Sequence, residues 1–426
     1  MKAKVFQVGL LVASIFAISN IAHAETVSID PLAVESYSKE FNVSDQEAKR
    51  RLTIVSQLDY IVQNLNKQFG DSIGSVYFDN GQDFKLVVRT TKKGNTQKQI
   101  MSLADQLSKE YSLPIEVVAN SPRNFKAIQN IVENQKSRIV KQYDGLQLIG
   151  YVPQNDAIRL SFYQPDVTKQ NEIKSRLQKV SGMNTLIEFL PEPMSFKAGI
   201  GGGGLLPSNT GYCTGGFTGT MNGQQGILTA THCMYGKTLS NYSNNGGAGA
   251  KVGLVGTIGK DAIMDSQYHE ISFLPLDITT SPLVGNVQKD FNYYIPTQTI
   301  TGIGYAKGPT VINSQYVGGT PVCHIGQKTG YSCGTVNTVS SGIGGGGCNS
   351  SVKQIIPMTS CASTYIEVRG PNFKILGGDS GGPLFDSSGK AYGIASAGGA
   401  LKDGSGYSGI FSSLAYVSGF TLKTGG

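Results

Sequence analysis

The sequence has no tryptophan, and after residue 24 it has only three histidines, His232, His269 and His324. It also has no Cys-x-x-Cys pair. Transition metals in proteins are usually held by closely spaced histidine and cysteine side chains. This shortage therefore argues against a metal site, and no motif in the chain implies an organic cofactor.

Long hydrophobic runs are missing after residue 24, so we expect no membrane anchor. The apolar run at 5–18 is short, follows two lysines, and precedes the small-residue pattern Ala22-His23-Ala24. This pattern is typical of a signal peptide cleaved before Glu25. We predict that residues 1–24 direct the protein to secretion.

Concentrated charge is also absent. The net charge is +7, but the basic residues are dispersed, and none of them form a run interleaved with aromatics. Proteins that bind nucleic acid usually carry such a basic patch. We therefore expect no nucleic-acid partner, and we expect a monomer.

The first half of the chain contains no cysteine. All six cysteines lie in the second half, namely Cys213, Cys233, Cys323, Cys333, Cys348 and Cys361. An even number of cysteines in an exported protein indicates disulfides. Six cysteines allow 15 pairings, so their count alone does not choose among them.

Glycine divides the chain into two parts. Only eight of the 55 glycines precede Ala198, and the boundary lies near 196–204. Before it, Ser44 and Glu47 match a capping box, which predicts a helix start. Apolar residues then recur at helical spacing and predict one amphipathic helix; they are Leu52, Val55, Leu58, Val62, Leu65 and Phe69.

The rest of the first part reads as two similar units. Hairpin 75–88, helix 95–112 and strand 114–118 follow the first helix. The same order of helix, hairpin, helix and strand recurs at 125–140, 146–163, 167–180 and 185–190. We therefore hypothesise an internal duplication, without residue-level identity to support it.

The second part consists of short runs rich in Val, Ile, Thr and Tyr with glycines about every ten residues, which predicts an all-β sandwich or barrel. A helix is expected only at 412–422. Glycine-rich, non-local β folds form slowly. We therefore interpret residues 25–197 as an α+β pro-region that aids folding or blocks the site, the alternative being a permanently attached domain.

Two short motifs indicate nucleophilic chemistry. Ser380 lies within Gly377–Pro383, and His232 lies within Thr229–Cys233. A serine hydroxyl needs a base to become a nucleophile, and its product anion needs backbone donors, here the N–H groups of Gly378 and Ser380. The alternative for the serine motif is a glycine-rich turn.

These two motifs, with the segments 211–217 and 322–335, resemble the secreted bacterial chymotrypsin-like serine proteases of the α-lytic protease and streptogrisin type. The resemblance implies an all-β catalytic domain at 198–426, preceded by the pro-region. That domain would consist of two six-stranded antiparallel barrels, at approximately 198–300 and 301–426, with the active site between them.

The resemblance also implies two disulfides, Cys213–Cys233 and Cys323–Cys333, which leaves Cys348 and Cys361 as the third pair. Many relatives carry a cysteine just before Gly-Asp-Ser. Leu376 and Gly377 stand there in this chain, so the third pair departs from the family pattern.

The acid of a catalytic triad should lie between His232 and the second barrel. The family motif at that place is an aspartate followed by an apolar run, and Glu270 fits it best. Asp265 and Asp277 are the rivals, and Glu270 could instead be a surface strand residue. A glutamate can serve because its carboxylate has the same chemistry on one more methylene.

Asp379 is adjacent to Ser380 and cannot reach behind the histidine. In relatives the corresponding aspartate is held by an arginine, and His324 stands at that position here. We therefore hypothesise that His324 pairs with Asp379.

By resemblance, Ser396, Ala397 and Gly398 pair with an extended peptide substrate. No acidic residue occurs at 372–376, and Ala395 replaces a histidine found in glutamate-specific relatives. We therefore expect a small or medium apolar residue before the scissile bond, although Lys374 gives a weak indication of acidic preference.

The sequence thus predicts a secreted serine endopeptidase that cleaves proteins or peptides and is matured near 196–201 by loss of its own pro-region. Ser380 is the expected nucleophile, His232 the base and Glu270 the orienting acid. Two alternatives remain, an inactive homologue that binds peptides or cell surfaces and a glycine-rich structural β protein.

Overall fold

The protein is described from a computed structural model. The described residues are 27–142, 146–163, 170–190, 199–200, 205–208, 211–234, 242–243, 251–254, 270–277, 286–288, 303–305, 308–309, 317–343, 365–417 and 419–422. The predicted signal peptide, Asp265 and the cysteines Cys348 and Cys361 lie outside this part of the chain.

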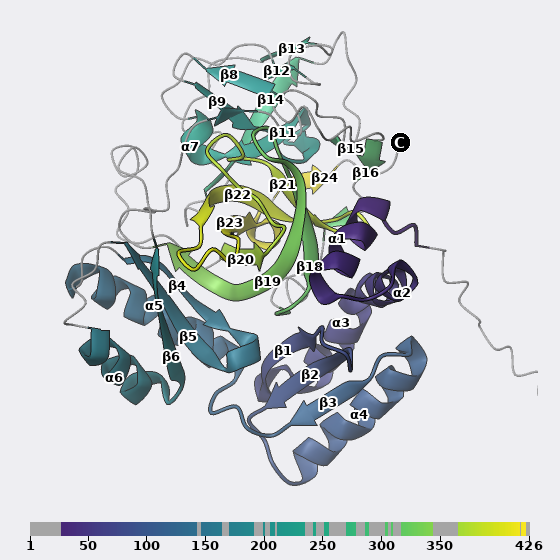
Figure 1. The fold of residues 1–426 in the computed structure, drawn as a ribbon, viewed down its shortest axis with the longest axis vertical. Coiled ribbons are helices and arrows are strands. Elements are labelled where there is room, and N and C mark those ends of the chain that lie inside the picture. Colours follow the sequence, from purple (N-terminus) through teal and green to yellow (C-terminus); the bar gives the residue numbers. More distant parts are fainter. Residues whose placement is uncertain are drawn as a thin grey trace, which may run out of the picture.

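The N-terminal segment forms two α+β lobes with the same order of elements (Figure 1). In each lobe a two-stranded hairpin is extended by a parallel third strand, β1-β2-β3 in one and β4-β5-β6 in the other. The predicted repetition of elements is therefore confirmed. The first lobe contains α1 (Pro31–Phe41), α2 (Asp45–Val55), α3 (Leu58–Phe69), β1 (Ile73–Asp79), β2 (Lys85–Thr90), α4 (Asn95–Tyr111) and β3 (Ile115–Val118). The second contains α5 (Phe125–Gln142), β4 (Leu146–Val152), β5 (Ala157–Tyr163), α6 (Gln170–Ser181) and β6 (Asn184–Leu190).

One predicted helix is two helices. Ser44 accepts a hydrogen bond from the Glu47 N–H at 3.2 Å, which confirms the predicted start of α2. The helix ends at Val55, where the Ser56 hydroxyl donates to the Thr53 carbonyl at 2.7 Å. The ammonium group of Lys390, from the far end of the chain, donates a hydrogen bond to the Ser56 carbonyl at 2.7 Å. Because that carbonyl binds a distant cation, the break depends on tertiary structure that helical periodicity does not encode.

The described residues of the second part form strands, as predicted, apart from one short helix and a 3₁₀ turn. Six strands close a barrel in the order β18-β21-β22-β23-β20-β19, because β18 also pairs with β19. These strands are β18 (Pro321–Gly326), β19 (Gly330–Ile343), β20 (Tyr365–Gly370), β21 (Pro383–Asp386), β22 (Lys390–Ala400) and β23 (Tyr407–Ser413).

The strands of the first barrel region lie in one sheet, ordered β24-β10-β11-β14-β13-β12-β8-β9-β7. They are β7 (Gly199–Ile200), β8 (Leu205–Ser208), β9 (Gly211–Thr214), β10 (Thr218–Met221), β11 (Gln224–Ala230), β12 (Tyr242–Ser243), β13 (Lys251–Leu254), β14 (Ile271–Asp277) and β24 (Phe420–Leu422). A short helix, α7 (Thr231–Met234), follows β11. Three further short strands are β15 (Asn286–Gln288), β16 (Ile303–Tyr305) and β17 (Gly308–Pro309).

The expected helix at 412–422 is wrong. Residues up to Ser413 continue β23, a single 3₁₀ turn covers Leu414–Tyr416, and β24 then pairs with β10. The last strand therefore joins the first barrel region. Pairing with a strand some 200 residues away overrides local helical periodicity.

The N-terminal segment is joined to the second barrel by a continuous sheet. Strand β4 pairs antiparallel with residues 339–343 of β19, beyond the part of β19 that pairs with β18, so the sheet of the second lobe continues from the end of this barrel strand. Charged side chains cross this junction: Arg369 binds Glu188 with two contacts at 2.8 and 2.6 Å, and Arg159 lies 3.4 Å from the buried Glu367. The first lobe adds the ion pair Lys390–Asp59 at 2.8 Å.

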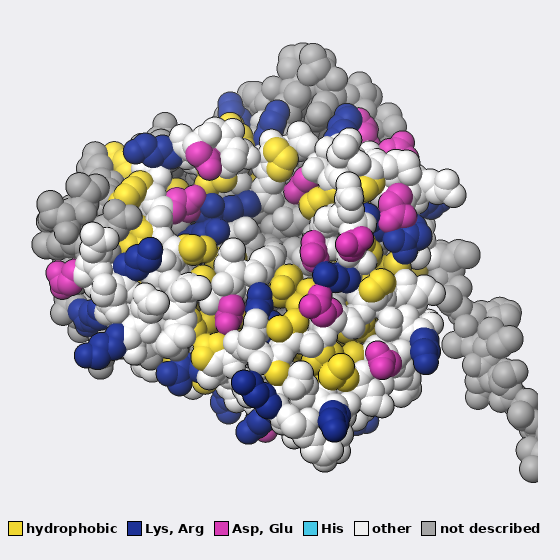
Figure 2. Space-filling view, turned by 60° about the horizontal axis from the view of Figure 1, so that its bottom comes forward, with side chains coloured by type: hydrophobic (Ala, Val, Ile, Leu, Met, Phe, Trp, Pro, Cys, Tyr) yellow, Lys and Arg dark blue, Asp and Glu magenta, His cyan; other side chains and the backbone are white. Residues whose placement is uncertain are grey.

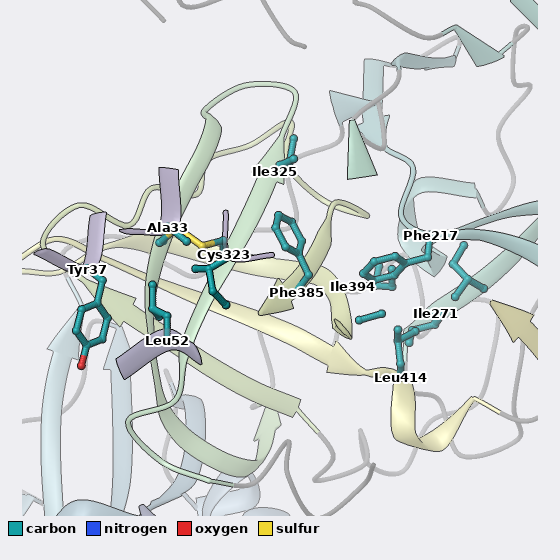
Figure 3. Packing of buried hydrophobic residues seen from close by; sticks show 14 of the residues in the cluster. Ala33, Tyr37, Leu52, Phe217, Ile271, Cys323, Ile325, Phe385, Ile394 and Leu414 are labelled. Carbon is teal, nitrogen blue, oxygen red and sulfur yellow. A yellow bond between two sulfur atoms is a disulfide. The ribbon is translucent and has the colours of Figure 1, made fainter. Parts of the chain in front are cut away.

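A second, apolar interface joins the two barrels. Phe217 and Ile271 from the first barrel region pack with Ile394 of the second barrel and with Leu414, which follows its strand β23 (Figure 3). The same cluster continues to Ala33, Tyr37 and Leu52 of α1 and α2, which pack beside the Cys323–Cys333 disulfide. Both disulfides implied by the resemblance that fall in described residues are confirmed, since Cys213 is bonded to Cys233 as well.

On the face shown in Figure 2, lysine and arginine side chains are interspersed with aspartate and glutamate rather than separated by sign. Among the described helices, none combines the length and apolar character required to cross a bilayer.

Candidate active site

Ser380 lies in a tight turn that leads into β21, and the residue is buried. Gly378 and Gly381 on its two sides have positive φ, +123° and +90°. A Cβ built on Gly381 would lie 1.7 Å from the Thr214 carbonyl oxygen. Glycine adopts positive φ without strain, so both positions suit glycine, and no larger residue fits at Gly381.

Asp379 holds this turn in place. Its carboxylate accepts hydrogen bonds from the backbone N–H groups of Leu376, Lys328 and Thr329 at 2.7, 2.8 and 3.1 Å. The Thr329 hydroxyl donates a fourth at 2.7 Å. Burial raises the pKa of Asp379 to about 6, although the four donors act in the opposite direction. The carboxylate thus ties the serine turn to the loop between β18 and β19.

The hypothesis that His324 pairs with Asp379 is wrong. His324 lies fully buried on β18, with Nδ1 3.3 Å from the Pro383 carbonyl and its ring against Phe411 and Phe373. Burial lowers its pKa to about 3, so the ring is neutral. Backbone N–H donors take the place of the family's arginine.

His232 and Glu270 are in direct contact. His232 lies on α7, directly after β11, and its Nδ1 donates to Glu270 Oε1. The backbone N–H of His232 reaches the same oxygen at 3.2 Å. Both residues are buried. The carboxylate holds Nδ1 of the imidazole, so Nε2 is directed away from Glu270.

Strand pairing explains this contact. In the β11–β14 pair Ala230 lies opposite Ile271, so the residues just beyond each, at 231–232 and 270, are neighbours. The Glu270 carbonyl accepts a hydrogen bond from the Thr231 N–H at 3.1 Å. Glu270 has φ +57°, a left-handed conformation that is unusual for a non-glycine residue and typical of functional positions.

Of the three acids considered, the structure brings Glu270 to the imidazole. Asp277 lies at the opposite end of β14, paired with Gly253, about 23 Å along the strand from Glu270. Asp265 lies outside the described residues.

His232 and Ser380 lie on either side of one disulfide. The Cys233 sulfur is 3.8 Å from His232 Nε2 and 3.7 Å from the Ser380 carbonyl oxygen. The two motifs, about 150 residues apart in sequence, thus meet between the barrels. Cys213, Cys233 and His232 also cluster in a way that could suit a metal, but the two sulfurs are bonded to each other and are not thiolates.

Two threonines that the sequence analysis did not select hold the serine turn to the first barrel region. The Thr214 N–H donates to the Ser380 carbonyl at 2.5 Å, and its hydroxyl donates to the Gly378 carbonyl at 2.6 Å. Thr229 in turn donates to the Thr214 carbonyl at 2.9 Å. Both threonines lie within the quoted motifs, but the direction of their hydroxyls could not be read from sequence.

The predicted peptide-binding residues Ser396, Ala397 and Gly398 lie on β22, next to the serine turn. Gly381 N–H donates to the Ala395 carbonyl at 2.7 Å, which anchors the turn to this strand. Among the described residues, 396–400 pair only with β23, so the other edge of β22 has no strand partner there.

Side chains that precede Ser380 crowd this strand. A Cβ built on Gly398 would lie 2.4 Å from Ile375 Cγ2, and one built on Gly409 would lie 2.7 Å from the Phe373 ring. Both apolar residues are buried, whereas Lys374 between them is exposed. Buried apolar side chains therefore pack directly against the Gly398–Gly409 pair of β22 and β23.

Comparison with known proteins agrees with this geometry. A family model described as Trypsin matches residues 208–420, half of the chain. Among solved structures, Thermobifida fusca Protease A is 20% identical, with 54% of this chain and 100% of that chain covered and a TM-score of 0.37. The corresponding values for Cellulomonas bogoriensis chymotrypsin are 21%, 53%, 98% and 0.36.

An α-lytic protease homolog, N4, is 17% identical, covering 51% of this chain and 94% of that chain, with a TM-score of 0.33. The family match spans both barrel regions, the histidine motif and the serine turn. The chain belongs to the trypsin family.

Proposed function

We propose that this protein is a secreted serine endopeptidase made as a preproprotein. The observation that carries the proposal is the contact between Glu270 and His232, beside the disulfide that adjoins Ser380. A carboxylate behind an imidazole, next to a buried serine, is the arrangement that activates a hydroxyl nucleophile.

In this mechanism Ser380 attacks the scissile carbonyl while His232 Nε2 accepts its proton and later passes it to the leaving amine. Glu270 fixes the tautomer by accepting from Nδ1 and stabilises the imidazolium that forms. The N–H groups of Gly378 and Ser380 stabilise the oxyanion. The positive φ of Gly378 supports this role, because it lets the backbone turn its N–H inward.

The substrate would bind as an added strand along the edge of β22 at Ser396, Ala397 and Gly398. The crowding by Ile375 and Phe373 supports a small or medium apolar residue before the scissile bond. A large aromatic side chain would need both residues to move.

Residues 25–197 would act as a pro-region, removed by cleavage near 196–201. The pairing of β4 with β19 supports a role in folding, because it supplies a template for the edge of the long barrel strand. The protein itself is the expected agent of this cleavage.

The test is to secrete the full chain beside its Ser380→Ala variant and to treat both with a serine-directed phosphonate. We expect release of the pro-region and covalent labelling in the parent, and neither in the variant. A folded parent that is not labelled would contradict the proposal.

A further inference from the structure

Two buried oxygen atoms near the candidate triad form no hydrogen bond of ordinary length among the described residues. Glu270 Oε1 receives both hydrogen bonds from His232, while Glu270 Oε2 is buried and has no hydrogen-bond partner among the described residues. The hydroxyl oxygen of Tyr365 is also buried and has no hydrogen bond of ordinary length there, although it interacts with Ser412. Buried polar groups of this kind cost free energy unless they are satisfied, so each requires an explanation.

The barrel places Tyr365 on the side that faces Glu270. Tyr365 begins β20 and lies opposite Ser412 of β23, which lies opposite Ile394 of β22. Cross-strand partners share one face of a sheet. Ile394 packs between the barrels with Ile271, the residue that follows Glu270 (Figure 3).

The neighbouring residues point the other way. Ala395 and Phe411, one position further along their strands, belong to the interior core of the second barrel. Because side chains alternate along a strand, Tyr365 is directed out of that interior and towards the first barrel region. Tyr365 is completely buried.

Charge and competition favour Tyr365 as the donor. Burial raises the pKa of Tyr365 well above 10, and the nearby negative charge of Glu270 raises it further, whereas the Ser412 hydroxyl acts in the opposite direction. The phenol is therefore protonated at neutral pH. The Ser396 hydroxyl is 2.7 Å from the Ser412 hydroxyl and 3.4 Å from the Ile394 carbonyl. Its hydrogen bonds are therefore used within its own sheet.

We propose that Tyr365 is a positioning residue whose phenol donates to Glu270 Oε2, so that both oxygens of the carboxylate are held. The proposal rests on the proposed function, with Glu270 as the triad acid. A glutamate has one more rotatable bond than an aspartate, so a second anchor is needed to keep its carboxylate against the imidazole. The donor also moderates how strongly Glu270 stabilises the imidazolium.

The test compares Tyr365→Phe with Tyr392→Phe in the secreted full-length chain after maturation. Tyr392 is a matched control, because it is a buried tyrosine of the same barrel, on β22, in the interior cluster. Active sites are counted by phosphonate labelling, and kinetics use a peptide anilide. For Tyr365→Phe we expect kcat to fall about 10-fold with KM unchanged, and the acid limb of the kcat/KM profile to move up by about 0.5 pH unit.

The direction of that shift follows from the chemistry. Without the phenol donor the carboxylate stabilises the imidazolium more strongly, so the base keeps its proton to higher pH. Tyr392→Phe should leave the acid limb in place. In a Glu270→Gln background, Tyr365→Phe should have no further effect on kcat, because the two residues act as one unit.

A second substitution covers the case in which Tyr365→Phe does not fold. Placing 3-fluorotyrosine at position 365 keeps the ring and makes the phenol a stronger donor, so the acid limb should move to lower pH. An acid limb unchanged by 3-fluorotyrosine, or effects of Tyr365→Phe that match those of Tyr392→Phe, would overturn the proposal. Phosphonate labelling of Ser380 in the parent reports the proposed function separately, so failure of one is not mistaken for failure of the other.

Discussion

A buried glutamate lies at each of the two interfaces of the second barrel, Glu270 on the first barrel region and Glu367 on the second barrel itself, and the partners of the two differ. Glu270, at the interface with the first barrel region, contacts the imidazole of His232. Glu367, at the junction with the N-terminal segment, lies between Arg369 at 2.5 Å and Arg159 at 3.4 Å. The hydroxyls of Ser408 and Thr338 donate to it at 2.6 and 2.9 Å.

The difference lies in what each partner can do with its charge. Arginine remains charged at every accessible pH, so Glu367 sits in a permanent ion network that can only hold elements together. An imidazole can accept and release a proton, so the charge beside Glu270 can change during a reaction. The same buried side chain thus serves structure at one interface and is suited to chemistry at the other.

The interfaces around the two glutamates also differ in composition. The packing between the barrels is apolar, with Phe217, Leu228, Ile271 and Ile394 in one cluster. The N-terminal segment is joined to the second barrel by apolar packing as well, but ion pairs and strand pairing are added to it around Glu367.

The comparison predicts that removing the charge reduces catalysis at Glu270 and reduces stability at Glu367. The largest effect is expected at Glu270. Glu270→Gln keeps the shape of the side chain but disturbs the imidazole tautomer, so kcat/KM should fall about 10⁴-fold. The measurement is peptide hydrolysis per phosphonate-reactive site. A fall of less than tenfold would show that another group orients His232.

Glu367→Gln should act on stability instead. It leaves the partly buried Arg159 and Arg369 without the buried Glu367 carboxylate, although Glu188 still binds Arg369. Removing one partner of a buried ion pair costs about 3–5 kcal/mol. We would measure denaturant unfolding of the uncleaved precursor in a Ser380→Ala background. The matched control, Glu270→Gln in the same background, should unfold within about 1 kcal/mol of its parent, and equal losses in the two variants would contradict the comparison.

The Glu367 network also predicts loss of stability in acid. Burial raises the pKa of Glu367, but the charges of Arg369 and Arg159 more than offset burial, so the pKa lies below its ordinary value. A lowered folded-state pKa contributes stability above the unfolded value, about 4.5, and that contribution is lost as pH falls through the folded value. Unfolding of the Ser380→Ala precursor from pH 7 to pH 3 should show this loss, and Glu367→Gln should lack it.

Glu40 predicts the smallest effect, with the opposite sign. It lies on α1 beside a small cavity lined by Cys333, Gly334 and Thr335, and burial raises its pKa to about 7. A raised folded-state pKa contributes stability below the unfolded value, about 4.5, and this is lost as pH rises through about 7. Glu40→Gln should therefore stabilise the precursor at pH 8 by about 1 kcal/mol and have no benefit at pH 4. Parallel pH–stability curves for the parent and Glu40→Gln would reject this assignment.

Much of the site could be predicted from sequence because its parts are local. The glycines around Ser380 and the placement of His232 after a β-strand are properties of a few consecutive residues, and the structure agrees with both. The repeated lobes could also be predicted from the sequence, because helical and alternating periodicities are short-range signals.

The failures have one cause. The break at Ser56, the strand at Phe420–Leu422 and the isolation of His324 from Asp379 each depend on a partner distant in sequence. Tyr365 was missed for the same reason, because nothing next to it in sequence relates it to Glu270.

The amino-acid sequence by itself determined the classes of element, the division at the glycine boundary and the chemical types present at the site, because these follow from local composition and spacing. Only the tertiary structure decided which acid meets His232 and which charges join the N-terminal segment to the barrel. Those choices depend on strand register and on burial. Both are set jointly by chain segments that lie far apart in the sequence.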